Sequence, residues 1–202
     1  MSEHAAPARR RGRPRGRSDA RQRIVTAATA EFSELGYDGA TMRGIAGRAG
    51  VDAALLHHYF GTKADLFGEI VGAPMRPDLK IPEILAGPRE QVGEAIVRYV
   101  LDVWEQPEAR RRGILVMRTA IGNKLATPLL AGFLSRELLG RIAADIGTPD
   151  AELRSGLIAT QVAGLLLARY VLRLAPLADA SVDELVAWVA PSVQRYLDAP
   201  SP

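Results

Sequence analysis

Residues 52–63 include a carboxylate, two imidazoles and an ammonium, which can make directional polar contacts. His57 and His58 are adjacent, so on a helix they diverge by about 100° and cannot chelate one metal ion, as a pair four residues apart can. Lys63 follows Thr62, which is placed to cap a helix with a carboxylate three residues later. A lysine beside the free N–H groups of a helix start is suited to hold a phosphate. The chemistry indicated is hydrogen bonding to an anionic partner.

Two short helices must position these side chains. Apolar residues recur at helical spacing in residues 42–49 and again in residues 55–60. Thr41 and Asp52 are placed to cap the two helices, and Gly50 between them is free to take the left-handed conformation. This pattern is typical of a helix-turn-helix, whose second helix lies in the DNA major groove. That helix would direct Asp52, Ala53, Ala54, His57 and His58 outward, and Leu55, Leu56 and Phe60 toward the core.

Residues 20 to 70 resemble the DNA-binding domain of the TetR family of transcriptional regulators. The resemblance runs from ARQRIVTAATAEFSELGYDGATMRGIA through GVDAALLHHYFGTKADLFGEI. Its landmarks are Phe32, Gly36, Thr41, Ile45, Ala46, Gly50, Val51, Leu56, Tyr59, Phe60, Lys63 and Leu66. Carried over by position, it implies operator contacts by Thr41, Arg43, Asp52, Ala53, Ala54, His57, His58, Tyr59 and Lys63. The aromatic residue usual at the position of His57 is absent, and two alanines offer no hydrogen bonds to bases, so we expect Arg43 to carry more of the readout.

Basic charge is concentrated in the first 17 residues, which hold six arginines and one glutamate, whereas the remainder has 20 basic and 22 acidic residues. Glycine and proline in RRRGRPRGR deny this segment a helix, so we expect a disordered arm that seeks phosphates. The segment from Arg11 through Arg13 to Arg15 resembles the core of the AT-hook, whose arginines enter narrow A·T-rich minor grooves. The alternative is a nonspecific basic tail. Both interpretations predict DNA contacts by the arm.

The composition is that of a globular protein of 202 residues, with 48% hydrophobic and 24% charged residues. The absence of cysteine excludes disulfides, thiolate zinc sites and cysteine nucleophiles. No glycine-rich phosphate loop, G-x-S-x-G or HExxH occurs, so we predict no enzyme and assign no catalytic residue, cofactor or metal ligand. The longest weakly polar run, residues 156–168, is too short to span a bilayer. We therefore expect a cytoplasmic protein without membrane segments.

Helical spacing continues along the chain without strand-like alternation, so the predicted fold class is all-α. After the arm (residues 1–17) we expect a three-helix, helix-turn-helix DNA-binding domain over 18–73 and a larger helical domain over 78–198. The first helix would bury Ile24, Ala28, Phe32 and Leu35 and end at Gly36. A fourth helix would run from Thr62 to about Gly72. Later helices are expected over 88–105, 107–121, 128–146, 149–174 and 181–197, with a short segment at 81–86.

The last two long helices are predicted to form a dimer interface. The helix over 149–174 is apolar almost all round and rich in small residues, which allows a second helix to approach closely. One side would face its own domain and the other a second copy of the chain. The interface residues expected are Gly156, Ala163, Gly164, Leu167, Val171, Val186, Val189 and Val193. The alternative is a core helix of a monomer.

The resemblance also implies an effector pocket in the C-terminal domain, which would control DNA binding. Candidate lining residues are Tyr99, Trp104, Met117, Arg118, Phe133 and Tyr170, although each could instead pack in the core. The function expected is that of a homodimeric, ligand-responsive regulator, a repressor released from a palindromic double-stranded DNA operator by a lipophilic small molecule. The competing class is an architectural protein that coats DNA without a ligand.

Overall fold

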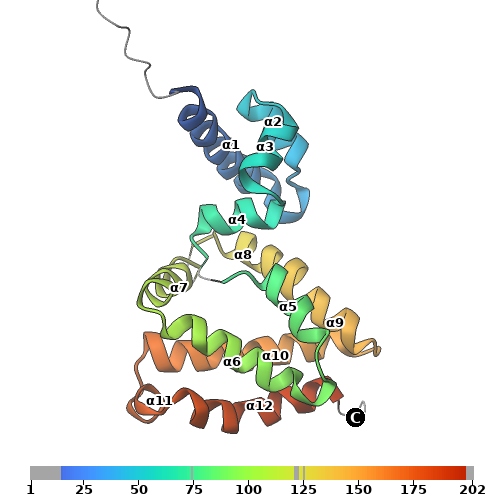
Figure 1. Cartoon of the computed structure of the whole chain (residues 1–202), viewed down its shortest axis with the longest axis vertical. Helices are drawn as coiled ribbons and strands as arrows, with labels where there is room; N and C mark the ends of the chain where they lie inside the picture. The colour runs from blue at the N-terminus through green and yellow to red at the C-terminus, as the bar shows by residue number, and fades with distance from the viewer. Residues whose placement is uncertain (1–14, 74, 121–122, 125, 199–202) are drawn as a thin grey trace, which may run out of the picture.

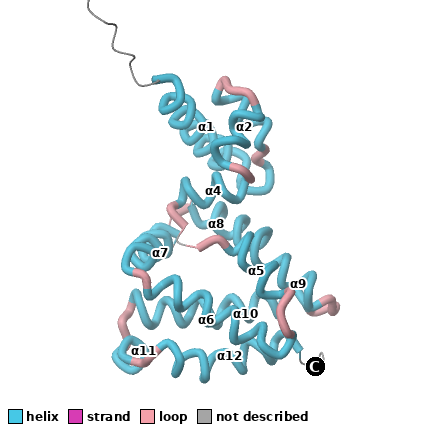
Figure 2. Tube along the Cα trace, in the orientation of Figure 1, coloured by secondary structure: helices cyan, strands magenta, loops and turns pink. Residues whose placement is uncertain are grey.

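The computed structural model describes residues 15–73, 75–120, 123–124 and 126–198. These residues form helices and turns and contain no β-strand, so the all-α prediction is confirmed for the part of the chain that is described. Figure 1 shows two stacked groups of helices, a smaller one built from the N-terminal helices and a larger one that ends with the C-terminus. The tube in Figure 2 shows that short loops join most of the helices.

The smaller group contains α1 (Arg15–Gly39), α2 (Met42–Ala49), α3 (Ala53–Phe60) and α4 (Lys63–Val71). Their buried side chains form one cluster, which we call the N-terminal core; it includes Ile24, Phe32, Ile45, Leu56, Phe60, Leu66 and Phe67. The φ angle of Gly36 is 74°, so this glycine interrupts α1 as predicted. Leu35, expected in the core, is 53% exposed. It lies in the final turn before this break, where α1 leaves the surface that it buries.

The larger group begins with α5 (Pro77–Leu85), α6 (Val92–Glu105) and α7 (Pro107–Ala120). It continues with α8 (Ala126–Leu134), α9 (Gly140–Ile146) and α10 (Ala151–Leu166), and it closes with α11 (Ala175–Asp179) and α12 (Val182–Asp198). Helices α6, α10 and α12 lie in the lower part of Figure 1, where α12 packs against both α6 and α10. The C-terminal core between them includes Ile96, Val97, Leu101, Trp104, Ile158, Leu185 and Val193.

Helix α8 joins the two groups because its Phe133 inserts into the N-terminal core. The Phe133 ring lies 5.4 Å from the ring of Tyr37 and 4.9 Å from that of Phe67, measured between centroids. The Tyr37 hydroxyl donates a hydrogen bond of 2.8 Å to a carboxylate oxygen of Glu137, and burial together with this bond raises the pKa of Tyr37. A side chain from the middle of the sequence thus completes the packing of the first four helices.

Two helices predicted as continuous are each interrupted by a wide turn. The segment predicted over 128–146 begins earlier, at α8, and passes through a π-helical turn at Ser135–Leu139 before α9. The segment predicted over 149–174 ends its regular helix at Leu166 and continues as a π-helical turn at Leu167–Val171. The chain then reverses at Arg173, whose φ angle is +53°. The short helix α11 after this reversal was not predicted.

Candidate DNA-binding site

Capping contacts fix the start of α2 and the turn between α2 and α3. The hydroxyl of Thr41 accepts a hydrogen bond of 3.0 Å from the backbone N–H of Gly44. Gly50 takes the left-handed conformation with φ 63°, and the carboxylate of Asp52 accepts from the N–H of Ala54 at 2.6 Å. Each polar side chain satisfies a backbone donor that the helix itself leaves unpaired, and glycine takes the positive φ without steric cost. The corner therefore forms where the sequence predicts it.

Helix α3 presents one face to the N-terminal core and the opposite face to solvent. Leu56 and Phe60 are buried at 0% and 6% exposure, as predicted. Leu55 is 36% exposed, so the prediction that it points into the core is wrong: on a helix it lies about 100° from Leu56, beyond the narrow buried stripe. The predicted contact residues Asp52, Ala54, His57 and His58 are exposed, and Ala53 and Tyr59 are half-buried.

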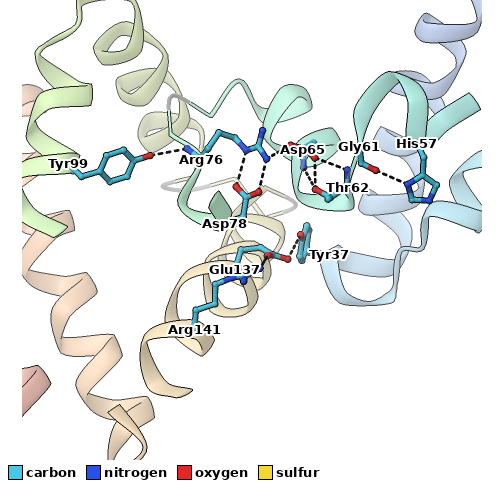
Figure 3. A network of polar contacts seen from close by, with 10 residues as sticks. All are labelled: Tyr37, His57, Gly61, Thr62, Asp65, Arg76, Asp78, Tyr99, Glu137 and Arg141. Atoms are coloured by element: carbon cyan, nitrogen blue, oxygen red, sulfur yellow. Dashed lines mark hydrogen bonds and ion pairs between the residues drawn. The ribbon is translucent and has the colours of Figure 1, made fainter. Parts of the chain in front are cut away.

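The C-terminal end of α3 is tied to the start of α4. A carboxylate oxygen of Asp65 accepts hydrogen bonds from the backbone and hydroxyl of Thr62, each at 2.7 Å, and the Asp65 N–H donates to that hydroxyl at 3.1 Å. His57 Nδ1 lies 2.7 Å from the carbonyl oxygen of Gly61, as Figure 3 shows. A carbonyl can only accept, so Nδ1 carries the proton and Nε2 remains for a second partner. The imidazole is thus held in a defined orientation on the exposed face.

Arg43 is the cation of α2 best placed for an external partner. Its side chain is exposed and makes no hydrogen bond or ion pair with another described residue. Arg48, on the same helix, is instead held by Glu34 and lies 3.1 Å from Glu31. Hydrogen bonding from Arg48 lowers the pKa of Glu34. The unpaired guanidinium of Arg43 can form two parallel hydrogen bonds to a base edge or a phosphate.

Lys63 has partners that the sequence did not predict. Its ammonium donates to the carbonyl oxygens of Tyr37 at 2.8 Å and Ala40 at 3.1 Å, and it lies 4.5 Å from the centre of the Tyr37 ring. Burial lowers the pKa of Lys63. The lysine therefore ties the start of α4 to the end of α1, and one of its three N–H donors is left for a phosphate. The phosphate contact itself stays a prediction.

The basic arm falls largely outside the described residues. Arg11 and Arg13 lie outside them, whereas Arg15 is the first residue of α1, so the prediction that residues 15–17 belong to an arm without a helix is wrong. Arg23 was not among the residues predicted from the sequence. Its side chain is exposed and donates to the carbonyl oxygen of Ala49 at 3.1 Å, at the corner of the helix-turn-helix. Its position on the first helix, several residues before the motif, gave no local signal of this contact.

The six residues predicted to line an effector pocket do not surround one cavity. Phe133 is 3% exposed and belongs to the N-terminal core, because α8 packs against α1. Tyr99 and Tyr170 line two different cavities, of about 440 and 510 Å³. The remaining three are Trp104, which is buried, Met117, which packs against the C-terminal core, and Arg118, which is exposed. Composition could identify aromatic residues but not which helix faces converge.

Two residues predicted at the dimer interface are inside the single chain. Val186 and Val193 are 3% and 0% exposed and pack in the C-terminal core, because this face of α12 lies against α6. They cannot contact a second chain. Ala163 and Gly164 are exposed, and the other four, Gly156, Leu167, Val171 and Val189, are half-buried. The outward faces of the same two helices carry residues that were not predicted, Leu153 at 66% and Trp188 at 83% exposure.

The described residues contain no helix long and apolar enough to cross a membrane. In the same part of the chain, no three histidine or acidic side chains come together in a way that could hold a metal ion.

Comparison with known proteins gives two family matches that together span most of the chain. Residues 24–70 match the bacterial regulatory proteins of the tetR family, and residues 90–197 match the tetracyclin repressor-like C-terminal domain. The HTH-type transcriptional regulator BetI of Agrobacterium fabrum is 33% identical over 175 residues, covering 82% of this chain and 84% of that protein. Among solved structures, a putative TetR-family regulator from Mesorhizobium loti is similar with a TM-score of 0.51 and 21% identity. The match covers 92% of this chain and 98% of the chain in that structure. A TetR-family regulator from Streptomyces coelicolor has 31% identity and a TM-score of 0.46. This match covers 95% of this chain and 99% of the chain in that structure.

Proposed function

The chain belongs to the TetR family of DNA-binding transcriptional regulators, and from this premise we propose that it is a homodimeric repressor released from its operator by a small molecule. The observation that carries the DNA-binding part is the solvent-exposed face of α3, with Asp52, Ala54, His57 and His58, on a helix capped at both ends. Such a helix enters the major groove with little loss of conformational freedom, because its backbone is already fixed. We further propose that the protein acts in the cytoplasm and has no catalytic activity.

Dimerisation would use the outward faces of α10 and α12. Ala163 and Gly164 on α10 and Trp188 on α12 are exposed small or apolar residues on two helices that pack against each other. A Trp side chain exposed at 83% is a candidate anchor for a partner surface. Two copies related by a two-fold axis would bring two α3 helices to successive major grooves, about one DNA turn or roughly 34–36 Å apart.

A ligand can weaken DNA binding only if it binds better to a dimer whose two α3 helices are spaced differently. Helix α4 contacts both groups, since it packs on α1 and the ring of its Phe67 lies 4.9 Å from that of Phe133 on α8. We propose that a lipophilic effector acts through this helix. Displacement of the protein from its operator by a panel of lipophilic compounds tests this part.

The DNA-binding part is tested in two steps. Bound sequences are selected from a random duplex library, and the sequence that binds most tightly is then footprinted with the protein. We expect two inverted half-sites protected in one footprint. Ala54→Glu adds a negative charge to the exposed face of α3 and should abolish binding, whereas Ala144→Glu on exposed α9 should not. Binding without sequence preference, with both variants equally active, would instead favour an architectural protein.

A further inference from the structure

The arginine run of α7 lies beside a cavity that the DNA-binding role does not use. This second cavity, of about 510 Å³, is bordered by the end of α6, the start of α7, the wide turn after α10, and α11. Arg110, Arg111, Arg169 and Arg173 line it, and Glu105 is the carboxylate among its lining residues. In Figure 1 the helices α7 and α11 lie far from α3. A DNA contact through α3 therefore does not explain why cationic groups gather at this cavity.

Two of the four guanidinium groups are already paired inside the chain. Arg169 is 8% exposed; its Nη2 lies 2.8 Å from a Glu105 carboxylate oxygen, and it also donates to the carbonyl oxygens of Leu177 and Ala180. Arg111 pairs with Glu108 at 2.6 Å. These two arginines have their charge compensated by neighbouring carboxylates.

Arg110 and Arg173 are different. Neither makes an ion pair or hydrogen bond to another residue of the described chain, although Arg110 lies 6.0 Å from the centre of the Tyr170 ring. Glu105 forms no ion pair or hydrogen bond with either of them: its bonded oxygen accepts from Arg169 and, at 2.9 Å, from the Tyr170 hydroxyl, and the charge of Arg110 only helps to lower the pKa of Glu105. The cavity thus presents two guanidinium groups whose hydrogen-bond donors are unused.

The backbone at Arg173 supports a role for its side chain. Its φ of +53° is the only positive value at a non-glycine position among the described residues. A residue with a Cβ is strained in this region, and glycine would relieve the strain. Strain of this kind clusters at binding sites, where a side chain is needed despite the backbone.

The remaining lining is apolar and limits the kind of occupant. Pro107, Ile114 and Ala178 border the cavity, together with Tyr170. Guanidinium groups bind carboxylate and phosphate oxygens through paired N–H donors, and an apolar wall favours a hydrocarbon body. We propose that this cavity binds a small organic anion, with its carboxylate or phosphate group held by Arg110 and Arg173 and its apolar part against Ile114. Binding is measured without DNA, so the inference stands apart from the proposed regulatory function.

The test titrates the full chain with octanoate, octyl phosphate, inorganic phosphate and neutral octanol. Trp104 lies 5.3 Å from Tyr170 between ring centroids, and Trp188 is the other tryptophan of the sequence. In a Trp188→Phe background, the fluorescence of Trp104 therefore reports on the cavity, with calorimetry as a second readout. We expect at least one of the two octyl anions to bind saturably and octanol to bind about tenfold more weakly, since only the anion forms charge-assisted hydrogen bonds. The better of the two octyl anions identifies the head group.

The variants separate binding from folding. Arg110→Gln and Arg173→Gly should each weaken binding of the octyl anion about tenfold. Arg173→Gly also relieves the backbone strain, so it should melt no earlier than the parent chain while it loses affinity. Arg112→Gln is the matched control, because Arg112 is on the same helix, pairs with Glu108 and does not line the cavity. The proposal is overturned if octanol binds as tightly as both anions, if neither octyl anion binds, or if the two cavity variants bind like the control.

Discussion

Arg76 and Asp65 form an ion pair across the junction between the two groups of helices. Asp65 sits in the first turn of α4, where it caps the helix with Thr62, and Arg76 immediately precedes α5. The same guanidinium also donates to both carboxylate oxygens of Asp78, at 2.9 and 2.7 Å, and Figure 3 shows it between the two acids. One side chain therefore links α4 to α5.

The junction extends in both directions as a chain of polar contacts. The backbone N–H of Arg76 donates to the Tyr99 hydroxyl at 3.3 Å, and Tyr99 lines the first cavity. On the other side, Asp65 holds Thr62, whose neighbour Gly61 accepts from His57 on α3. A movement of Tyr99 could thus reach the exposed face of α3 through contacts that are all within hydrogen-bond distance.

The contribution of Asp65 to stability should depend on pH. Burial opposes ionisation, but hydrogen bonds from Thr62 and the charge of Arg76 outweigh it and lower the pKa of Asp65 from its ordinary value of 3.8. A carboxylate with a lowered folded pKa stabilises the fold above its unfolded pKa and loses this effect as pH falls through the folded pKa. Asp65→Asn should therefore lower the melting temperature at pH 7, and this effect should shrink as the pH falls below 3.8 and through the lowered folded pKa.

A double-mutant cycle isolates the ion pair of Asp65 with Arg76. Both side chains are partly exposed, at 23% and 40%, so we expect a coupling free energy of unfolding of about 1 kcal/mol for Asp65→Asn with Arg76→Gln at pH 7. Urea unfolding of the four proteins measures it. Coupling that does not weaken as the pH falls through the folded pKa of Asp65 would mean that the interaction is not ionic. Lys80→Gln with Glu83→Gln, an exposed pair within α5, is the control cycle.

Arg43→Ala should change sequence preference rather than affinity for all DNA. The Arg43 guanidinium has no partner among the described residues, and a bidentate contact to guanine contributes about 1–3 kcal/mol of discrimination. Binding to operator duplexes with each base pair substituted in turn should show relaxed specificity at one position in each half-site. Arg48→Ala is the control, since Arg48 is held by Glu34. A uniform loss on every duplex would assign Arg43 to the phosphate backbone instead.

The helix caps and the turn glycine of the fold could be predicted from the sequence. The caps at Thr41, Asp52 and Thr62 depend on residues within three positions, so their side chains indicate the helix start directly. Gly50 likewise signals its own positive φ. The structure contains each of these features where it was predicted.

Contacts between distant helices could not be read in this way. Phe133 has the same apolar character whether it packs on its own domain or on Tyr37, nearly a hundred residues earlier. The valine stripe of α12 showed that one face is buried but not that α6, within the same chain, covers it. The cavity arginines come from α7 and from the turn after α10, so only the tertiary fold brings them together.

Lys63→Met should reduce both stability and DNA affinity. Loss of the two hydrogen bonds to the carbonyl oxygens of Tyr37 and Ala40 should cost about 1–2 kcal/mol of unfolding free energy, because the donor is charged and partly buried. If the third N–H also holds a phosphate, affinity should fall by a similar factor on every DNA sequence. Chemical denaturation measures the free energy of unfolding, and binding to operator and random duplexes measures the DNA affinity. Lys80→Met, which removes an ion-paired lysine of α5, should change neither by as much.

Gly164→Leu should dissociate the dimer without unfolding the chain. A Cβ added at Gly164 meets no atom within 4 Å in the single chain, so we expect the main effect of a larger side chain to come from a second copy. Sedimentation should show monomers with normal helical content that bind the operator weakly. Gly47→Leu, also without neighbours but on α2, is the matched control and should remain dimeric. An intact dimer for Gly164→Leu would move the interface to another surface.

Removing the basic arm should flatten the salt dependence of DNA binding. Helix α1 begins at Arg15, so deletion of residues 1–14 leaves the described helices complete while it removes four arginines. Each neutralised phosphate releases about 0.9 counterions, so loss of about three contacts per protomer should reduce the slope of log affinity against log salt by roughly 2 to 3 per protomer. Fluorescence anisotropy at several salt concentrations measures the slope, and the melting temperature should stay unchanged.

The same deletion decides between the two interpretations of the arm. If Arg11 and Arg13 enter the minor groove, the loss of affinity should be greater for operators with A·T-rich flanks, whose narrow grooves attract arginine, than for G·C-rich flanks. Equal losses on both flanks leave a nonspecific tail. Replacing Arg11 and Arg13 by lysine refines the comparison, because lysine keeps the charge but lacks the planar guanidinium. A nonspecific tail should tolerate this replacement on both flanks, whereas a groove-reading arm should lose its A·T preference and keep its salt slope.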